Sequence, residues 1–326
     1  MFQNNSKGKI FVIISFSLLT LIIAACKPFT EPQPQLRIGT NIWSGYEPLY
    51  LARELGYYDE SQLRLVEFNS SSDVITALRN GSLEAAALTL DEALTLLQDG
   101  FKLKIILVMD FSDGGDVLLG KPYLKSLAML QNKTIAVENT AVGAILLDGA
   151  LQAANLDVAD INIISCTWNE HKTCFQNTDA VVTFEPAKTL LLKQGAIPLF
   201  DSSQIPDRIV DVLVVQEGIL ADDQITLRQL LQGYFKARQY YFENQEKAAE
   251  LIAPRMALTA EEVIKAFEGI KLPDLEENHT LLASKAPGIQ KITIRLRDLM
   301  LQQSLLSKDV NVSEVANGSF LPDLPK

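Results

Sequence analysis

LRIGTNIWSGYEPLYLARELGYY, residues 36–58, is the segment that indicates the fold most clearly. It opens with a short β-favouring run, Leu36–Ile42, and Gly45 then favours a turn. Pro48 suits the first turn of a helix, because its missing N–H would have no partner there. Apolar residues recur at helical spacing up to Gly56, which is able to end the helix in a left-handed conformation. We therefore expect a strand, a tight polar turn and a helix, in that order.

The same order of elements repeats along the chain. Strand-like runs occur at 36–42, 63–68, 83–88, 102–109, 133–137, 161–164, 180–184, 197–200 and 209–215. Segments with helical spacing separate most of these runs, and a mostly helical pattern follows from about residue 225. Strands that alternate with helices indicate parallel strands joined by crossover helices, so the fold class is α/β.

A chain of this length has room for two α/β lobes. We expect residues 36–119 and 216–326 to form lobe 1 and residues 120–215 to form lobe 2. The C-terminal helices should pack on lobe 1. Two crossings between the lobes would make a two-strand hinge, with a ligand cleft between the lobes.

The N-terminal segment is typical of an export signal. Lys7 and Lys9 precede a nearly continuous apolar run, Ile10–Ala25, which is short for a membrane span. The run ends in Ile-Ala-Ala-Cys at residues 23–26, which resembles the bacterial lipobox. We expect residues 1–25 to be a lipoprotein signal peptide, Cys26 to carry the lipid, and residues 26–35 to form a tether. The alternative is a transmembrane anchor with an incidental cysteine. With a lipid on Cys26, the folded part would lie outside the cytoplasm, in the cell envelope.

Composition narrows the classes of function. The formal net charge of −11 argues against nucleic acid, because a phosphate backbone requires clustered Lys and Arg. The chain has two histidines, no Cys/His cluster with zinc spacing and no phosphate-binding glycine loop, so we expect no enzyme, no cofactor and no metal. His171 and Cys174 are close in sequence, but that spacing is a weak signal of thiol chemistry. Cys166 and Cys174 leave two alternatives open, a disulfide or two unpaired thiols.

Polar and aromatic residues follow most of the expected strands. If the strands are parallel, these residues meet in one crevice at their carboxyl ends. Aromatic walls with a few directed polar groups suit a small-molecule cleft. The alternative for single members, such as Ser72 and Asp91, is helix capping. The expected ligand-binding residues are Asn41, Trp43, Tyr46, Ser71, Ser72, Thr89, Asp91, Asp110, Ser112, Asp116, Glu138, Thr140 and Glu185.

An ordered series of short motifs resembles a known family. The opening Ile38–Tyr58 is similar to that of the solute-binding proteins that serve ABC importers of nitrate, sulfonate, taurine and thiamine-pyrimidine type. Further matches in family order are Ala77–Gly81, Asp91–Leu94, Gly114–Asp116, Lys133–Val137, Thr183–Pro186 and Ile209–Leu213. The resemblance implies the type II periplasmic-binding-protein fold, a small-molecule ligand held between two lobes, and an ABC permease in the membrane as partner.

The anion-binding members present basic groups or open helix N-termini to their ligands, whereas the positions carried over by this resemblance include Asp91, Asp110, Asp116, Glu138 and Glu185. No Lys or Arg lies in the strand-end segments. We therefore expect a small neutral or cationic ligand, aromatic or amine-bearing, and a monomeric receptor. The alternatives are an anion receptor of the same fold, for sulfonate, nitrate or taurine, and a lipoprotein that senses a ligand and signals. An enzyme on this fold fits less well, because its relatives use a His/Cys-rich site.

Overall fold

A computed structural model describes residues 35–138 and 140–324 of the chain. The expected signal peptide, the lipidated Cys26 and the tether up to residue 34 lie outside the described residues. Within the described ranges, no helix is both long and apolar enough to cross a membrane.

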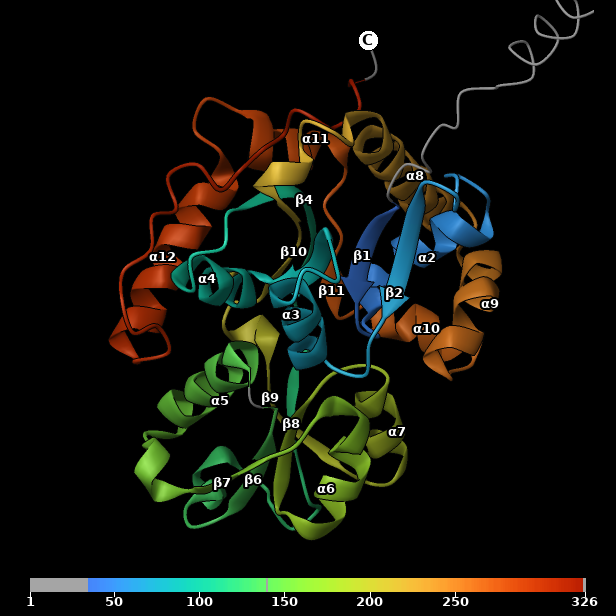
Figure 1. Cartoon of the computed structure of the whole chain (residues 1–326). Coiled ribbons are helices and arrows are strands. Elements are labelled where there is room, and N and C mark those ends of the chain that lie inside the picture. Colours follow the sequence, from blue (N-terminus) through green and yellow to red (C-terminus); the bar gives the residue numbers. More distant parts are fainter. Residues whose placement is uncertain (1–34, 139, 325–326) are drawn as a thin grey trace, which may run out of the picture. The chain divides into compact units, whose positions relative to one another are not determined.

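Strands and helices alternate through most of the described chain (Figure 1). The strands are β1 (Leu36–Thr40), β2 (Leu63–Glu67), β3 (Ala85–Thr89), β4 (Leu103–Ser112), β5 (Val117–Gly120), β6 (Thr134–Val137), β7 (Asn162–Ser165), β8 (Ala180–Thr183), β9 (Ile197–Asp201), β10 (Val210–Gln216) and β11 (Ile270–Lys271). The α-helices are α2 (Glu47–Glu54), α3 (Ser71–Arg79), α4 (Leu90–Gln98), α5 (Ala141–Ala154), α6 (His171–Asn177), α7 (Ala187–Lys193), α8 (Gln224–Glu243), α9 (Gln245–Met256), α10 (Ala260–Phe267), α11 (Leu275–Asn278) and α12 (Gly288–Gln302).

The strands form two sheets that share a pattern of strand directions. The first sheet has the order β11-β4-β10-β3-β1-β2 and the second has the order β7-β6-β8-β5-β9. In the first sheet β2, β1 and β3 are parallel and β10 is antiparallel to both β3 and β4. In the second, β7, β6 and β8 are parallel and β5 is antiparallel to β8 and β9. Counted from β2 in the first sheet and from β7 in the second, the fourth strand (β10 or β5) is antiparallel to both of its neighbours.

The two sheets include β5 and β10 in a way that differs from the expected lobe boundaries. The strand β5 belongs to the second sheet although residues 117–119 were assigned to lobe 1, and it was not expected as a strand. The strand β10 belongs to the first sheet although residues 210–215 were assigned to lobe 2. The expectation of parallel strands throughout is wrong for both. In each lobe, the strand next to a crossing between the lobes completes the sheet. A short apolar run such as VLLG does not indicate which of the two sheets it joins, because periodicity alone carries no information on strand pairing.

The two crossings between the sheets are bonded to one another. The hydroxyl groups of Ser112, at the end of β4, and Ser202, just after β9, lie 2.7 Å apart. The Ser202 hydroxyl also accepts a hydrogen bond from the Gly114 N–H at 2.8 Å, and its own N–H donates to the Asp116 carbonyl at 2.9 Å. The hinge is thus a pair of hydrogen-bonded segments, residues 113–116 and 202–209.

The C-terminal helices pack around the first sheet. Helices α2, α8, α9 and α10 lie together beside β1 and β2 in Figure 1. They share an apolar cluster of their own that includes Leu51, Tyr241, Ile252 and Phe267. The ring of Tyr241 stacks on that of Phe267 with centres 4.2 Å apart. This cluster anchors α2, and with it the turn that precedes α2, to the C-terminal part of the chain.

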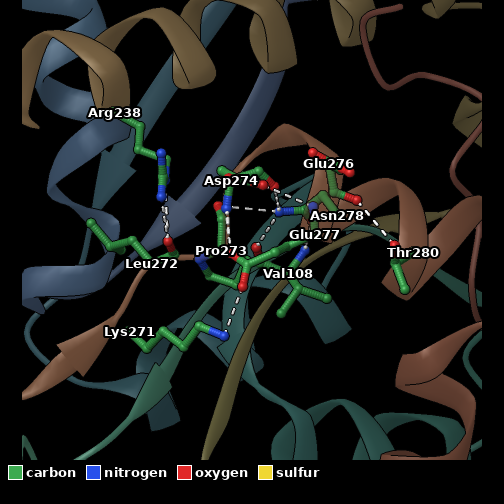
Figure 2. Close-up of polar contacts among 10 residues, drawn as sticks. All are labelled: Val108, Arg238, Lys271, Leu272, Pro273, Asp274, Glu276, Glu277, Asn278 and Thr280. Atoms are coloured by element: carbon green, nitrogen blue, oxygen red, sulfur yellow. Dashed lines mark hydrogen bonds and ion pairs between the residues drawn. The ribbon is translucent and has the colours of Figure 1, made fainter. Parts of the chain in front are cut away.

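A buried asparagine supports β4 from its outer side (Figure 2). The Asn278 side chain is fully buried; its Oδ1 accepts from the Val108 N–H at 2.9 Å, and its Nδ2 donates to the Val108 carbonyl at 3.1 Å. The amide therefore pairs with β4 as a neighbouring strand would. A capping pair, Asp274 and Glu277, fixes the short helix α11 that carries it. Because β4 ends in Asp110–Ser112, this clamp also helps to position the cleft described next.

Candidate functional site

A small cavity lies where residues of both sheets converge. The space inside it that is open to a water-sized sphere is about 30 Å³. The first sheet and its loops supply Asn41, Trp43, Tyr46, Ser71, Thr89 and Asp211, and the second supplies Asp116, Glu138, Val142 and Phe184. No Lys or Arg is among these lining residues. A molecule in this cavity would touch both lobes at once.

The turn after β1 brings the aromatic wall into place. Trp43 has an extended backbone and precedes a 3₁₀ turn, Ser44–Tyr46, which leads directly into α2. A Cβ on Gly45 would lie 1.6 Å from Asp110 Oδ2 and 2.7 Å from Trp43 Nε1. Only glycine fits there, because any side chain would displace both groups. The turn predicted from the sequence is therefore packed directly against the carboxyl end of β4.

Two buried aspartates hold the two aromatic side chains. Trp43 Nε1 donates to Asp110 Oδ2 at 3.1 Å, and the Tyr46 hydroxyl donates to Asp211 Oδ1 at 2.5 Å. Asp110 and Asp211 are partners in the β4–β10 register, so their side chains come from adjacent strands. Asp211 was not expected in the site. It lies at the beginning of β10, and the start of an antiparallel strand meets the same sheet edge as the carboxyl ends of its neighbours.

The second sheet contributes an apolar and acidic wall. Phe184 follows β8, Glu138 follows β6, and Val142 lies in the first turn of α5. The rings of Phe184 and Trp43 meet edge to face with centres 5.7 Å apart, which joins the two walls. Asp116 comes directly before β5, whose first residue pairs with the last residue of β8. It therefore lies at the same edge as Phe184.

The expected site residues fall into two groups. Asn41, Trp43, Tyr46, Ser71, Thr89, Asp116 and Glu138 line the cavity. Asp91 and Asp110 are fully buried and stand outside the lining set, with Asp110 bonded to Trp43. Ser112 lies at the hinge, and Glu185 accepts from the N–H and hydroxyl of Thr189, so it caps α7. Ser72 and Thr140 are partly buried and do not line the cavity.

The lining residues that the expected set lacks are Val142, Phe184 and Asp211. Phe184 was expected only as the last residue of a strand, and nothing in the sequence marked its ring as an aromatic wall. A basic side chain was also missed near the site: Lys188 Nζ donates to the Gly114 carbonyl at 2.9 Å and lies 3.9 Å from Glu185 Oε1. Its position one helical turn after Glu185 was the available signal.

The site is electrostatically unusual, because carboxyl groups gather there without matching cations. Burial raises the pKa of Asp91, Asp110 and Glu138 to about 7, that of Asp116 to about 6 and that of Glu92 to about 8. Burial, followed by the charge of Asp110, raises the pKa of Asp211 well above its ordinary value. These groups hold protons at pH values where exposed carboxyls have lost them.

Cys174 has no free thiol that could react beside His171. A disulfide joins Cys174 to Cys166 in the structure. His171 Nδ1 lies 2.9 Å from the Thr183 hydroxyl, and burial lowers the pKa of the imidazole to about 4. The His171 ring also meets the Phe184 ring edge to face at 6.0 Å. His171 thus supports the aromatic wall as a neutral, buried side chain. Within the described ranges, no group of three or more His, Cys, Asp and Glu side chains is arranged to hold a metal ion.

The sequence matches a model of the NMT1-like family over residues 30–254. The chain belongs to the NMT1-like family. The matched range includes β1 to β10 and thus every residue that lines the cavity. No curated protein matches this NMT1-like chain significantly.

Solved structures share the fold of this NMT1-like protein. The periplasmic aliphatic sulphonate binding protein SsuA from Escherichia coli is 20% identical, with a TM-score of 0.70 over 87% of this chain and 98% of its own. The ligand-binding component of an ABC-type import system from Staphylococcus aureus, with zinc bound, is 18% identical, with a TM-score of 0.73 over 89% and 98%. SsuA from Xanthomonas axonopodis pv. citri, bound to MOPS, is 18% identical, with a TM-score of 0.71 over 87% and 98%. The two sheets are those of the type II periplasmic-binding-protein fold.

Proposed function

We propose that this protein is the extracytoplasmic solute-binding component of an ABC importer. The observation that carries the proposal is the cavity between the two sheets, lined by side chains from both. Family membership and the likeness to importer components support the same role. The proposed role is binding and delivery of a solute, without catalysis.

A solute in the cavity would hold the lobes together. Trp43 and Tyr46 would contact it from the first lobe, and Phe184 and Glu138 from the second. Binding to groups on both sides favours the closed arrangement, because only that arrangement offers all of the contacts together. The hydrogen-bonded crossings at Ser112 and Ser202 would serve as the pivot. A permease that recognises the closed form would then receive loaded protein in preference to empty protein.

The anchor belongs to the same proposal. Signal processing before Cys26 and lipid attachment to its thiol would keep the receptor close to the membrane permease, as a monomer. Mass analysis of the protein recovered from membranes should give a first residue Cys26 that carries acyl chains. A mature protein that retains residues 1–25, or one cleaved elsewhere without lipid, would contradict the anchor and leave the receptor role untouched.

Two linked assays test the receptor role. A thermal-shift screen of small solutes should find compounds that stabilise the wild-type protein and fail to stabilise a Trp43→Ala variant. Glu250→Gln, on the exposed face of α9, is the matched control and should respond like wild type. Uptake of the same compound should then fall in cells that produce only the Trp43→Ala variant. Unchanged uptake in those cells would contradict the importer role, and would favour a sensor.

A further inference from the structure

The carboxyl groups of the cavity form a cluster without a matching set of cations. Asp116, Glu138 and Asp211 line it, and Asp91, Glu92 and Asp110 stand close behind. None of the six is more than 6% exposed. A buried carboxylate without a counter-charge is costly, so each of these groups either holds a proton, as the raised pKa values indicate, or meets a cation when it is ionised.

The basic side chains that come near are already engaged. Lys188 is bonded to the Gly114 carbonyl and lies beside Glu185, outside the set of residues that line the cavity. Arg255 pairs with Glu47 and with Glu67, and its guanidinium lies over the Tyr50 ring at 3.4 Å. The charge of Lys188 lowers the pKa of Asp116, and this one cation does not match six carboxyl groups.

Several oxygens of the site lack hydrogen-bond partners. Glu138, which lines the cavity, is 6% exposed, and its Oε1 has no partner among the described residues. The same holds for Oδ1 of Asp110 and for both carboxyl oxygens of Asp91, which are fully buried. Buried polar atoms are nearly always satisfied, so the oxygen of Glu138, the member of this group that lines the cavity, indicates that a hydrogen-bond donor belongs there.

The aromatic residues favour the same kind of donor. Trp43, Tyr46 and Phe184 line the cavity together with the acidic groups. Aromatic faces attract cations, and Trp does so most strongly. An organic cation with N–H groups would meet both needs, since its charge offsets the carboxylates and its apolar part packs on the rings.

We propose that the cavity takes a small organic cation, an amine or amidine with an apolar or aromatic body, whose N–H groups pair with Glu138 and the aspartates around it. This inference rests on the proposed receptor function and names the chemical class of its solute. It differs from a metal site, since the acidic groups of the described chain have no arrangement that holds a metal ion.

Three probes of nearly equal size test the assignment: benzamidine, which is a cation, benzamide, which is neutral, and benzenesulfonate, which is an anion. Calorimetric titration at about pH 8 should give benzamidine a Kd at least about tenfold lower than that of benzamide, which is the expected gain from a charge-assisted contact. Benzenesulfonate should not bind. Glu138→Gln, or Asp116→Asn if the first variant folds poorly, should remove most of the difference between benzamidine and benzamide. The control Glu250→Gln should preserve it.

The outcomes separate the solute class from the receptor role. Equal or tighter binding of benzamide or benzenesulfonate overturns the cation assignment and leaves a receptor for another solute. Binding of none of the three probes also overturns the assignment, provided that native mass spectrometry still finds a solute retained from a metabolite extract. If that extract leaves no bound solute, the receptor role itself fails. Stabilisation by Zn²⁺ alone would replace the organic cation with a metal.

Discussion

The ring of Phe184 meets the ring of Trp43 edge to face, with centres 5.7 Å apart. The two residues are 141 positions apart in the chain, and each follows a strand of a different sheet. Trp43 is further fixed by its hydrogen bond to Asp110, and Phe184 by the ring of His171. This contact is an apolar link between the lobes, and both residues line the cavity.

Removing the Phe184 ring should weaken solute binding more than it weakens the fold. Phe184 is only partly buried, and a solute would cover it further. We expect Phe184→Ala to raise the Kd of a bound solute at least about tenfold, which corresponds to the loss of one aromatic contact. Phe242→Ala, which removes a ring that is 56% exposed on α8, is the matched control. Similar losses in both variants would show that the effect is general destabilisation.

A methyl group at position 45 should damage the site from within. The Cβ of Gly45→Ala would overlap Asp110 Oδ2 and crowd Trp43 Nε1. The buried hydrogen bond between these two groups would have to break or shift, at a cost of about 1–3 kcal/mol. We expect lower thermal stability together with loss of solute binding. Gly218→Ala, where an added Cβ would meet no atom within 4 Å, is the control. A Gly45→Ala variant that binds normally would contradict the described packing of the turn.

The pH dependence of stability should follow the buried carboxyls. Their folded-state pKa values, about 6 to 8, exceed their ordinary values, so folded protein binds more protons than unfolded protein between about pH 4 and pH 8. Stability of the solute-free protein should therefore fall as pH rises through this window. The groups involved are Asp91, Glu92, Asp110, Asp116, Glu138 and Asp211, which face Asp73, Tyr46 and Lys188. Burial likewise raises the pKa of Glu47 to about 7, so this group acts in the same direction.

His171 acts in the opposite direction below about pH 6.5, because burial lowers its pKa. Scanning calorimetry between about pH 6.5 and pH 8.5 avoids that contribution. The midpoint temperature should drop by several degrees over this range in wild type and by less in Glu138→Gln. A cationic solute should stabilise the protein more at the higher pH, because the carboxylates that pair with it are then ionised. A midpoint that rises with pH in this range would be inconsistent with protonated carboxyls in the cleft.

Loss of the Asn278 amide should destabilise the first sheet. Asn278→Ala leaves the N–H and carbonyl of Val108 without their present partners in a buried place (Figure 2). We expect the free energy of unfolding to fall by about 2–3 kcal/mol, as measured by urea denaturation. Thr280→Ala removes an exposed hydroxyl from the same region and should change stability by less than about 0.5 kcal/mol. Equal changes in the free energy of unfolding of the two variants would mean that the Asn278 side chain contributes little to the stability of β4.

The disulfide should stabilise the segment that supports the second wall. Cys166 and Cys174 close a loop with a sequence separation of 8, which contains His171. Constraint of such a loop in the unfolded chain amounts to about 2–3 kcal/mol in the chain-entropy model. A Cys166→Ala/Cys174→Ala double variant should lose roughly this stability. Thiol titration of the unfolded, oxidised protein checks the premise, since a disulfide leaves no reactive thiol at these positions.

The sequence predicted the elements that depend on neighbouring residues well. It predicted the features that depend on distant parts of the chain, such as strand direction, poorly. Turn residues and helical spacing in residues 36–58 predicted β1, the turn and α2, because these depend on neighbours in the chain. The same reasoning located Asn41, Trp43, Tyr46, Thr89 and Glu138 at strand ends. Asp211 was missed because it begins an antiparallel strand, and strand direction depends on which sheet the chain returns to. Phe184 was missed because an aromatic residue at the end of a buried strand gives no sign of which cavity it faces.

Native mass spectrometry of gently purified protein can show whether the cleft between the two sheets holds a small solute. We expect one added small-molecule mass on the wild-type protein, lost on unfolding and absent from the Trp43→Ala variant, while Glu250→Gln retains it. A wild-type protein that carries no added mass, even after incubation with a metabolite extract of its own organism, would contradict solute binding in the cleft. Retention of the same mass by Trp43→Ala would place the solute elsewhere and contradict it as well.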